Sequence, residues 1–304
     1  MRRMTTSRAF AAAAAAGVLA LCASPALARD VKRCGVTIGA GKTGTLVQDV
    51  ECGYRCSGDS TVRCVFERED YRCPVDRGQW CVPETILLER NATLFLNGFK
   101  LRGAYGQTVV ECAPSRQGRC TIEGPGRLEA PKGRPVRAND QDVTLKSLTV
   151  FGPYDAIETA GWVRLEDFTM QQCDASIIGG KGVRVRNARF SASCYLYSRG
   201  NLYVDGIDAV DGFTAEGDVR AKDVVVREGG IAGKNVALKG AQVPAPPRDW
   251  LPNRPDVLAK KRLVLRDATV GGIESGVKPV LRGASCLRST KTGTADTWGV
   301  CDGE

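Results

Sequence analysis

Histidine is absent from all 304 residues of the chain. It is the commonest protein ligand of metals and the usual partner of a catalytic serine or cysteine. Its absence excludes Ser-His and Cys-His catalytic pairs and removes the commonest zinc ligand. We therefore expect no metal site and no cofactor.

Long contiguous blocks of lysine and arginine are also missing, and only 6% of the residues are aromatic. The whole chain carries a formal net charge of +9, with 43 Lys plus Arg against 34 Asp plus Glu. Without the N-terminal Arg2, Arg3 and Arg8, an excess of six cations remains. Nucleic-acid-binding proteins concentrate far more basic charge in one stripe or patch. We expect no nucleic-acid partner.

After the first thirty residues, no segment approaches the 18 to 20 uninterrupted apolar residues of a membrane-spanning helix. The N-terminus itself has three arginines, an alanine-rich apolar stretch from Ala11 to Leu21, and the small-x-small sequence Ala26-Leu27-Ala28. This order is typical of a signal peptide and predicts cleavage after residue 28. We expect a secreted or periplasmic protein. A lipidated Cys22 is an alternative, although Leu21 is bulkier than such sites prefer.

Twelve of the thirteen cysteines follow Cys22, an even number in a chain sent to an oxidising compartment, and this favours disulfides. Cys112 and Cys120 flank a short loop, Cys173 and Cys194 fall at similar points of successive repeats, and Cys286 and Cys301 flank the C-terminal tail. We expect these three pairs. The remaining six cysteines allow fifteen pairings, which stay open: Cys34, Cys52, Cys56, Cys64, Cys73 and Cys81.

An internal repeat decides the fold class. One unit recurs: apolar-x-apolar, a polar residue, a turn-forming residue, and apolar-x-apolar again. Seven copies start 20, 20, 19, 17, 17 and 27 residues apart, at Val143, Val163, Val183, Leu202, Val219, Val236 and Leu263. Leu94 to Leu101 fits the same template, and Cys120 to Leu128 fits with one extra residue.

The fifth position of every regular copy holds a residue that tolerates a left-handed backbone. These residues are Ser147, Asp167, Asn187, Gly206, Asp223, Gly240 and Asp267. Each half-unit alternates with the period of a half-buried strand. Two short strands meeting at a bend describe one coil of a β-solenoid, so we predict an all-β parallel β-helix of about nine coils with disulfide-stapled caps.

The segment from Asn91 to Gly103 (NATLFLNGFKLRG) resembles the opening coil of right-handed parallel β-helix, pectin-lyase-like proteins. The chain is also similar to bacterial exported β-helix proteins with a leading Cys-Gly, here Cys34-Gly35, and a closing Trp-Gly-Val-Cys, here 298–301. The resemblance implies a single-stranded, right-handed β-helix. Because that family contains lyases, hydrolases, tailspikes, adhesins and binding proteins, the resemblance implies no one activity.

The expected organisation is a signal peptide over 1–28, a cysteine-rich N-terminal cap over 29–85, the β-helix over 86–285 and a disulfide-closed tail over 286–304. The cap is polar and holds six cysteines, so disulfides are expected to replace a core there.

Outward side chains of a solenoid stand in columns. The second position of the seven copies is Thr144, Arg164, Arg184, Tyr203, Arg220, Ala237 and Val264, and the fourth is Lys146, Glu166, Arg186, Asp205, Lys222, Lys239 and Arg266. We expect a ligand-binding basic face formed by Arg164, Glu166, Arg184, Arg186, Tyr203, Asp205, Arg220 and Lys222. Arginine suits the carboxylates or sulfates of an acidic polysaccharide.

The leading interpretation is a non-catalytic, monomeric, exported module that binds acidic polysaccharide. A solvated strand face that binds nothing would have a similar composition. The first functional alternative is a pectin-lyase-like polysaccharide lyase, with Tyr203 as general base beside Arg184 and Arg186, or a glycoside hydrolase using Glu166 and Asp205. The second is an adhesin or protein-docking module. The Pro244 to Pro255 insertion, the longest between copies, is another candidate surface.

Overall fold

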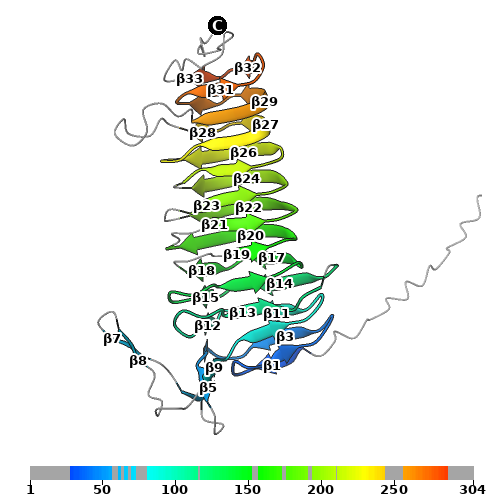
Figure 1. Cartoon of the computed structure of the whole chain (residues 1–304), viewed down its shortest axis with the longest axis vertical. Helices are drawn as coiled ribbons and strands as arrows, with labels where there is room; N and C mark the ends of the chain where they lie inside the picture. The colour runs from blue at the N-terminus through cyan, green and yellow to red at the C-terminus, as the bar shows by residue number, and fades with distance from the viewer. Residues whose placement is uncertain are drawn as a thin grey trace, which may run out of the picture.

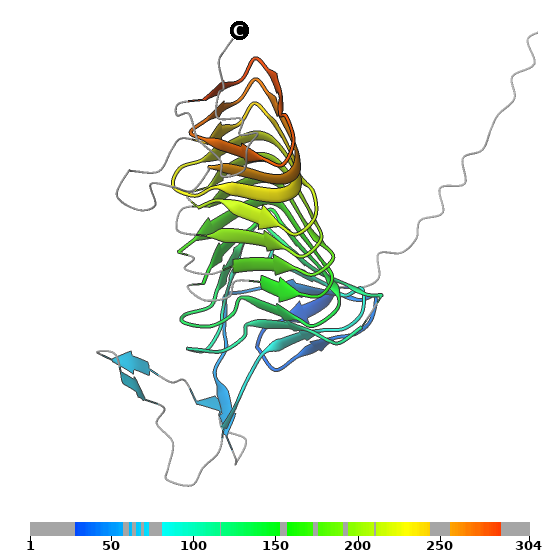
Figure 2. The ribbon, with the colours of Figure 1, turned by 45° about the horizontal axis from the view of Figure 1, so that its top comes forward.

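The computed structural model describes residues 28–56, 61–62, 65–67, 70–72, 81–115, 117–152, 157–172, 176–190, 194–209, 211–243 and 256–286. These residues form an all-β parallel β-helix, a long stack of coils that rises from β1 to β32 and β33 (Figure 1). Each coil has three faces, and every face is a ladder of parallel strands from successive coils (Figure 2).

The first face is the part that the repeat did not predict. It consists of β2 (Thr37–Ile38), β10 (Ile86–Leu88), β13 (Val110–Cys112), β16 (Val136–Ala138), β19 (Ile157–Thr159), β21 (Ser176–Gly179), β23 (Tyr195–Ser198), β25 (Phe213–Ala215), the starts of β27 (Ile231–Lys239) and β29 (Val257–Arg266), and β31 (Ile273–Ser275). Its apolar side chains point into the core, so each coil has three strands where two were expected.

The second face carries the first half of each repeat. It consists of β1 (Arg29–Val31), β3 (Thr43–Leu46), β11 (Thr93–Phe95), β14 (Arg119–Glu123), β17 (Asp142–Lys146), the first halves of β20 (Trp162–Gln171), β22 (Gly182–Phe190), β24 (Asn201–Ala209) and β26 (Val219–Val226), the second halves of β27 and β29, and β32 (Val280–Arg282). From β3 onwards this ladder has eleven rungs.

The third face carries the second half of each repeat. It consists of β4 (Val50–Glu51), β12 (Lys100–Arg102), β15 (Arg127–Glu129), β18 (Thr149–Phe151), the second halves of β20, β22, β24 and β26, and then β28 (Gln242–Val243), β30 (Thr269–Val270) and β33 (Ser285–Cys286). The core lies between the three faces and is almost entirely aliphatic, with Phe168, Phe190 and Phe213 as its largest members.

The bend between the second and third faces confirms the repeat. All seven fifth-position residues have positive φ, from 49° at Asp167 to 66° at Gly206. The strand pairings also align all seven copies as predicted, from Val143 opposite Val163 to Val236 opposite Leu263. A left-handed residue turns the chain by a sharp angle between two short strands, which is why glycine, asparagine and aspartate recur there.

The upstream register differs from the expectation at Leu94. Leu94 pairs with Ile122, which pairs with Leu145, so Leu94 occupies the third position and not the first. The coil needs two additional residues, and a shift of two keeps the same side chains facing inwards. The pattern alone could not distinguish these two registers.

The stack is longer than the nine coils expected. Thr37 to Glu51 form a coil that pairs with the next one, and Val31, Ile38, Leu46 and Val50 of this region lie in the common core. At the other end, Val280 pairs with Val264 and Cys286 with Val270, although Pro279 stands where the repeat has an apolar residue. The β-helix therefore already begins within the segment expected to be a cap.

The remaining strands lie outside the three faces. Strand β5 (Tyr54–Cys56) pairs antiparallel with β6 (Thr61–Val62) and with β9 (Cys81–Pro83). Strands β7 (Val65–Glu67) and β8 (Asp70–Arg72) form a separate antiparallel pair.

Three disulfides join described cysteines. The Cys112–Cys120 pair is confirmed, and Cys34–Cys52 and Cys56–Cys81 resolve part of the pairing that was left open. Cys194 is also disulfide-bonded. Cys64, Cys73, Cys173 and Cys301, the expected signal peptide apart from Ala28, and the Pro244 to Pro255 insertion lie outside the described residues.

Among the described residues, no helix is long and apolar enough to cross a membrane. Within the same part of the chain, no three cysteine, aspartate or glutamate side chains gather as metal ligands would.

Candidate functional site: the basic second face

The second face carries the predicted columns as continuous rows of outward side chains. In the row of second positions, Arg184 pairs with Tyr203 and Tyr203 with Arg220. In the row of fourth positions, Arg186 pairs with Asp205 and Asp205 with Lys222. Buried valine, leucine and alanine side chains alternate with them along each strand, so the core fixes where both rows point.

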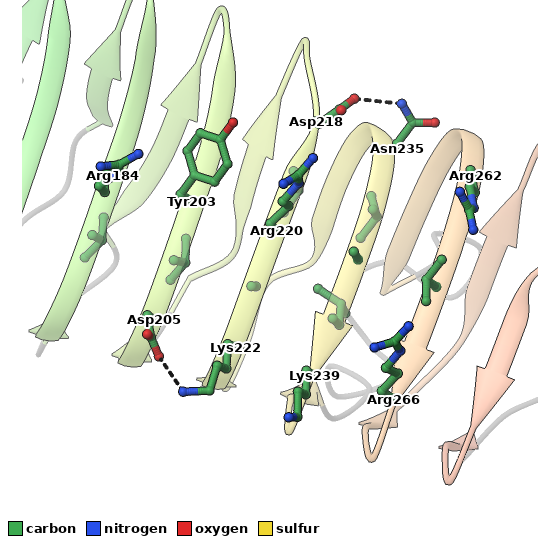
Figure 3. Close-up of a pocket in the computed structure, with 18 of the residues that line it drawn as sticks. Arg184, Tyr203, Asp205, Asp218, Arg220, Lys222, Asn235, Lys239, Arg262 and Arg266 are labelled. Atoms are coloured by element: carbon green, nitrogen blue, oxygen red, sulfur yellow. Dashed lines mark hydrogen bonds and ion pairs between the residues drawn. The ribbon is translucent and has the colours of Figure 1, made fainter.

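A shallow groove of about 790 Å³ lies along this face (Figure 3). It extends from β22 to β29 and includes six of the eight residues expected to bind the ligand. Seven cations and two carboxylates line it: Arg184, Arg186, Arg220, Lys222, Lys239, Arg262, Arg266, Asp205 and Asp218. The groove therefore has an excess of five positive charges.

Arg164 and Glu166 lie outside the groove, although they belong to the same two rows. Arg164 is held by Asp142, with 2.9 Å between Nη1 and Oδ2. Glu166 forms an ion pair with Arg186 of the next coil. The basic character of the face is thus largely neutralised at its β20 end.

Asp142 illustrates how firmly that end is paired. Burial alone would raise the pKa of its carboxyl, but the hydrogen bond from the Trp162 backbone N–H and the Arg164 guanidinium outweigh burial and hold the pKa below its ordinary value. Arg164 also lies 5.8 Å from the centroid of the Trp162 ring. This arginine therefore already has two intramolecular partners.

Tyr203 lies between two arginines near the middle of the face, as Figure 3 shows. The guanidinium carbons of Arg184 and Arg220 are 5.4 and 5.9 Å from the centroid of its ring. Asn201 donates a hydrogen bond of 3.4 Å to the Tyr203 hydroxyl. Stacking on an aromatic ring orders long cationic side chains before any ligand arrives.

Lys222, a cation of the groove, forms ion pairs with two carboxylates. Its Nζ lies 3.2 Å from Asp223 and 3.4 Å from Asp205. The hydrogen bond to Asp223, together with the charges of both carboxylates, raises the pKa of Lys222. Asp205 is the one carboxylate in the row of fourth positions from β22 onwards, and its charge is compensated by Lys222.

Beyond Lys222, the row of fourth positions contains only cations. Lys222 pairs with Lys239, Lys239 with Arg266, and Arg266 with Arg282. No carboxylate of the described residues forms an ion pair with Lys239, Arg266 or Arg282. We call these three side chains the cation row.

Several residues of this face were missed by the sequence analysis. Lys239 and Arg266 stood in the predicted column but were not assigned to the site, and Arg282 belongs to the unrecognised last coil. Trp162 and Arg262 each precede the first apolar residue of a copy, a position that the repeat did not include. An available signal was that this position also holds Asn201, Asp218 and Asn235, all polar.

Comparisons with family models, curated proteins and solved structures find no match for the chain, so the site is interpreted from its own geometry.

Proposed function

We propose that this protein is an exported, non-catalytic module that binds acidic polysaccharide along its basic second face. The observation that carries the proposal is the cation row. Like charges at the same register position of neighbouring strands destabilise a sheet. Three such cations on consecutive coils, without a carboxylate partner among the described residues, are the arrangement expected where an external polyanion supplies the countercharge.

The spacing of the face supports a polymeric ligand. Coils repeat at about 4.8 Å, so the cations form a regular line along the stack. A small anion would contact one or two of them, whereas a linear polyanion reaches every coil. Arginine guanidinium groups bind carboxylates and sulfates through two parallel hydrogen bonds.

The disulfides agree with an oxidising compartment, where such a ligand would be met.

A direct binding assay tests this function. The mature protein is measured against polygalacturonate, alginate, heparin and a neutral glucan over a range of salt concentrations. We expect binding to at least one acidic glycan, weakening steeply as salt rises, because exposed charges are screened over about 8 Å at physiological ionic strength. Absence of binding to all three acidic glycans, or equal binding to the neutral glucan, would contradict the proposal.

A polysaccharide lyase is a second candidate, favoured by the position of Tyr203 between Arg184 and Arg220. A general base must reach the proton of its substrate, and flanking cations would neutralise the uronate carboxylate. An ultraviolet assay for unsaturated uronate ends distinguishes the two functions. An ultraviolet signal that is lost in Tyr203→Phe would establish the lyase. If the acidic glycans bind but give no such signal, the protein is a binding module.

A further inference from the structure

Part of the groove has an apolar floor. Along the row of second positions, the outward residues change from Tyr203 and Arg220 to Ala237 and then Val264. Both floor residues are partly exposed and line the groove. The face is therefore recessed over β27 and β29, where short apolar side chains replace long cationic ones.

Cations stand on both sides of this floor. Lys239 and Arg266 follow two residues after Ala237 and Val264 on the same strands, and Arg262 precedes Val264 by two residues. In Figure 3, Lys239 and Arg266 lie along one edge and Arg262 lies along the other. Acidic groups on either edge of a bound chain would thus meet a cation.

The one carboxylate on the Arg262 side is already engaged. Asp218 accepts a hydrogen bond of 2.7 Å from the side-chain amide of Asn235. Asn235 occupies the register position next to Arg262. Asn235 therefore stands between Asp218 and Arg262 on three successive strands. Among the described residues, the Arg262 guanidinium has no ion-pair partner.

From this geometry we infer a specific binding mode, which rests on the proposed function. A linear acidic glycan lies lengthwise along the stack, with the apolar C–H face of a sugar ring on Ala237 and Val264. Its acidic groups point to both edges, towards Lys239 and Arg266 on one side and Arg262 on the other.

The floor makes the site selective for acidic sugars over other polyanions. A sugar ring removes apolar surface from water when it covers Ala237 and Val264, and this burial adds to the electrostatic attraction. Inorganic polyphosphate has no apolar face, so it interacts with the cations alone. The site should therefore distinguish a glycan from polyphosphate of equal charge by contact with the floor.

The test fills the floor without changing its charge. Ala237→Ile places a larger side chain in the recess, and a β-branched residue suits an outward strand position. Ala232→Ile is the matched control, because Ala232 lies on the same strand but on the first face, beside Thr214 and Leu258. Affinities of both variants and the parent are measured for polygalacturonate oligomers, alginate oligomers and inorganic polyphosphate, with circular dichroism to verify the fold.

We expect Ala237→Ile to weaken the binding of the acidic oligomers by at least about fivefold and that of polyphosphate by less than about twofold, because the larger side chain keeps a sugar ring from covering the floor and leaves the cations unchanged. Ala232→Ile should change neither. If Ala237→Ile weakens all three ligands equally or leaves all unchanged, the binding mode is wrong while the proposed function stands. If the parent binds no acidic oligomer, both fail.

Discussion

Lys239 and Arg266 occupy the same register position on adjacent coils, so two positive charges stand one strand spacing apart. Arg282 continues the row on the next coil, and none of the three has an ion-pair partner among the described residues. This arrangement costs stability in the free protein and becomes favourable only when an anion covers it. Stability and binding should therefore respond in opposite directions to its removal.

Replacing Lys239 by glutamine should raise the free energy of unfolding by about 0.5 kcal/mol at low salt, because it removes a repulsion between neighbouring cations. The gain should shrink as salt screens the charges. Denaturant unfolding at several salt concentrations measures it. Arg227→Gln is the control, since Arg227 lies 2.6 Å from Asp208 and its loss should give no gain. A destabilised Lys239→Gln would show that the row is not strained.

Gly212 should tolerate no side chain without loss of stability. A Cβ at this position would lie 1.8 Å from the backbone oxygen of Gly230 in the next coil, and neither backbone can move away without breaking the ladder. Gly212→Ala should lower the free energy of unfolding by about 3 kcal/mol, in the range of overpacked cores. Gly41→Ala is the comparison, because Gly41 has φ +65° but open space around it.

Gly41→Ala should lower the free energy of unfolding by only about 1 to 2 kcal/mol, the steric cost of a left-handed backbone for alanine. If both alanine variants unfold at the same denaturant concentration, close packing of the coils at Gly212 is not what excludes a side chain.

Ser147 is the residue least suited to the bend among the seven fifth positions, since the others are glycine, asparagine or aspartate. Ser147 has φ 55°, a conformation that glycine adopts without steric cost. Ser147→Gly should therefore raise the free energy of unfolding by about 0.5 kcal/mol, and Ser147→Val should lower it by at least about 1 kcal/mol. Thermal unfolding measures both changes as shifts of the midpoint temperature. If both variants shift the stability in the same direction, the left-handed bend is not what selects the residue at this position.

The Asp142 carboxylate should make stability depend on pH. Its pKa is lowered below 3.8 in the folded protein, so its contribution is fully present above the unfolded value and is lost as the pH falls through the folded value. Asp142→Asn should therefore cost about 0.5 to 1 kcal/mol near neutral pH, and the difference between parent and variant should begin to shrink only when the pH falls below the unfolded value of 3.8. Urea unfolding across this range measures it, and a difference that stays constant down to strongly acidic pH would contradict the assignment.

The repeat fixed the alignment of seven coils because every copy combines buried apolar residues with one left-handed bend, and both signals lie within eight residues. The first face lacked a comparable signal of its own. In five of the seven copies an apolar residue of this face stands six residues before the first position: Ile157, Ile177, Leu196, Phe213 and Val257. The distance is five residues for Ile231 and seven for Val136, and loops of variable length precede these residues, so the spacing gave no regular pattern.

The site was only partly predictable for a related reason. Column positions follow from the repeat, so the basic character of the face could be derived from Arg184, Arg220 and Lys222. Glu166 and Arg186 are fourth positions of successive copies, so their proximity also follows from the repeat. The sequence did not show that Asp142 neutralises Arg164, because Asp142 precedes the first apolar residue of its copy, a position that the repeat did not include. The unpaired charge consequently lies nearer the C-terminal end of the stack than expected.

If the cation row and its neighbours bind an acidic polysaccharide, the position of the cations should matter and not only their number. Two charge-matched triple variants test this: Lys239, Arg266 and Arg282 to serine, and Arg137, Arg189 and Arg199 to serine, the latter on or beside the other two faces. We expect the first variant to lose at least about tenfold in affinity for the acidic glycan, with a shallower salt dependence, and the second to lose less than about threefold. Equal losses would show that only net charge matters and that the cation row is not the binding site.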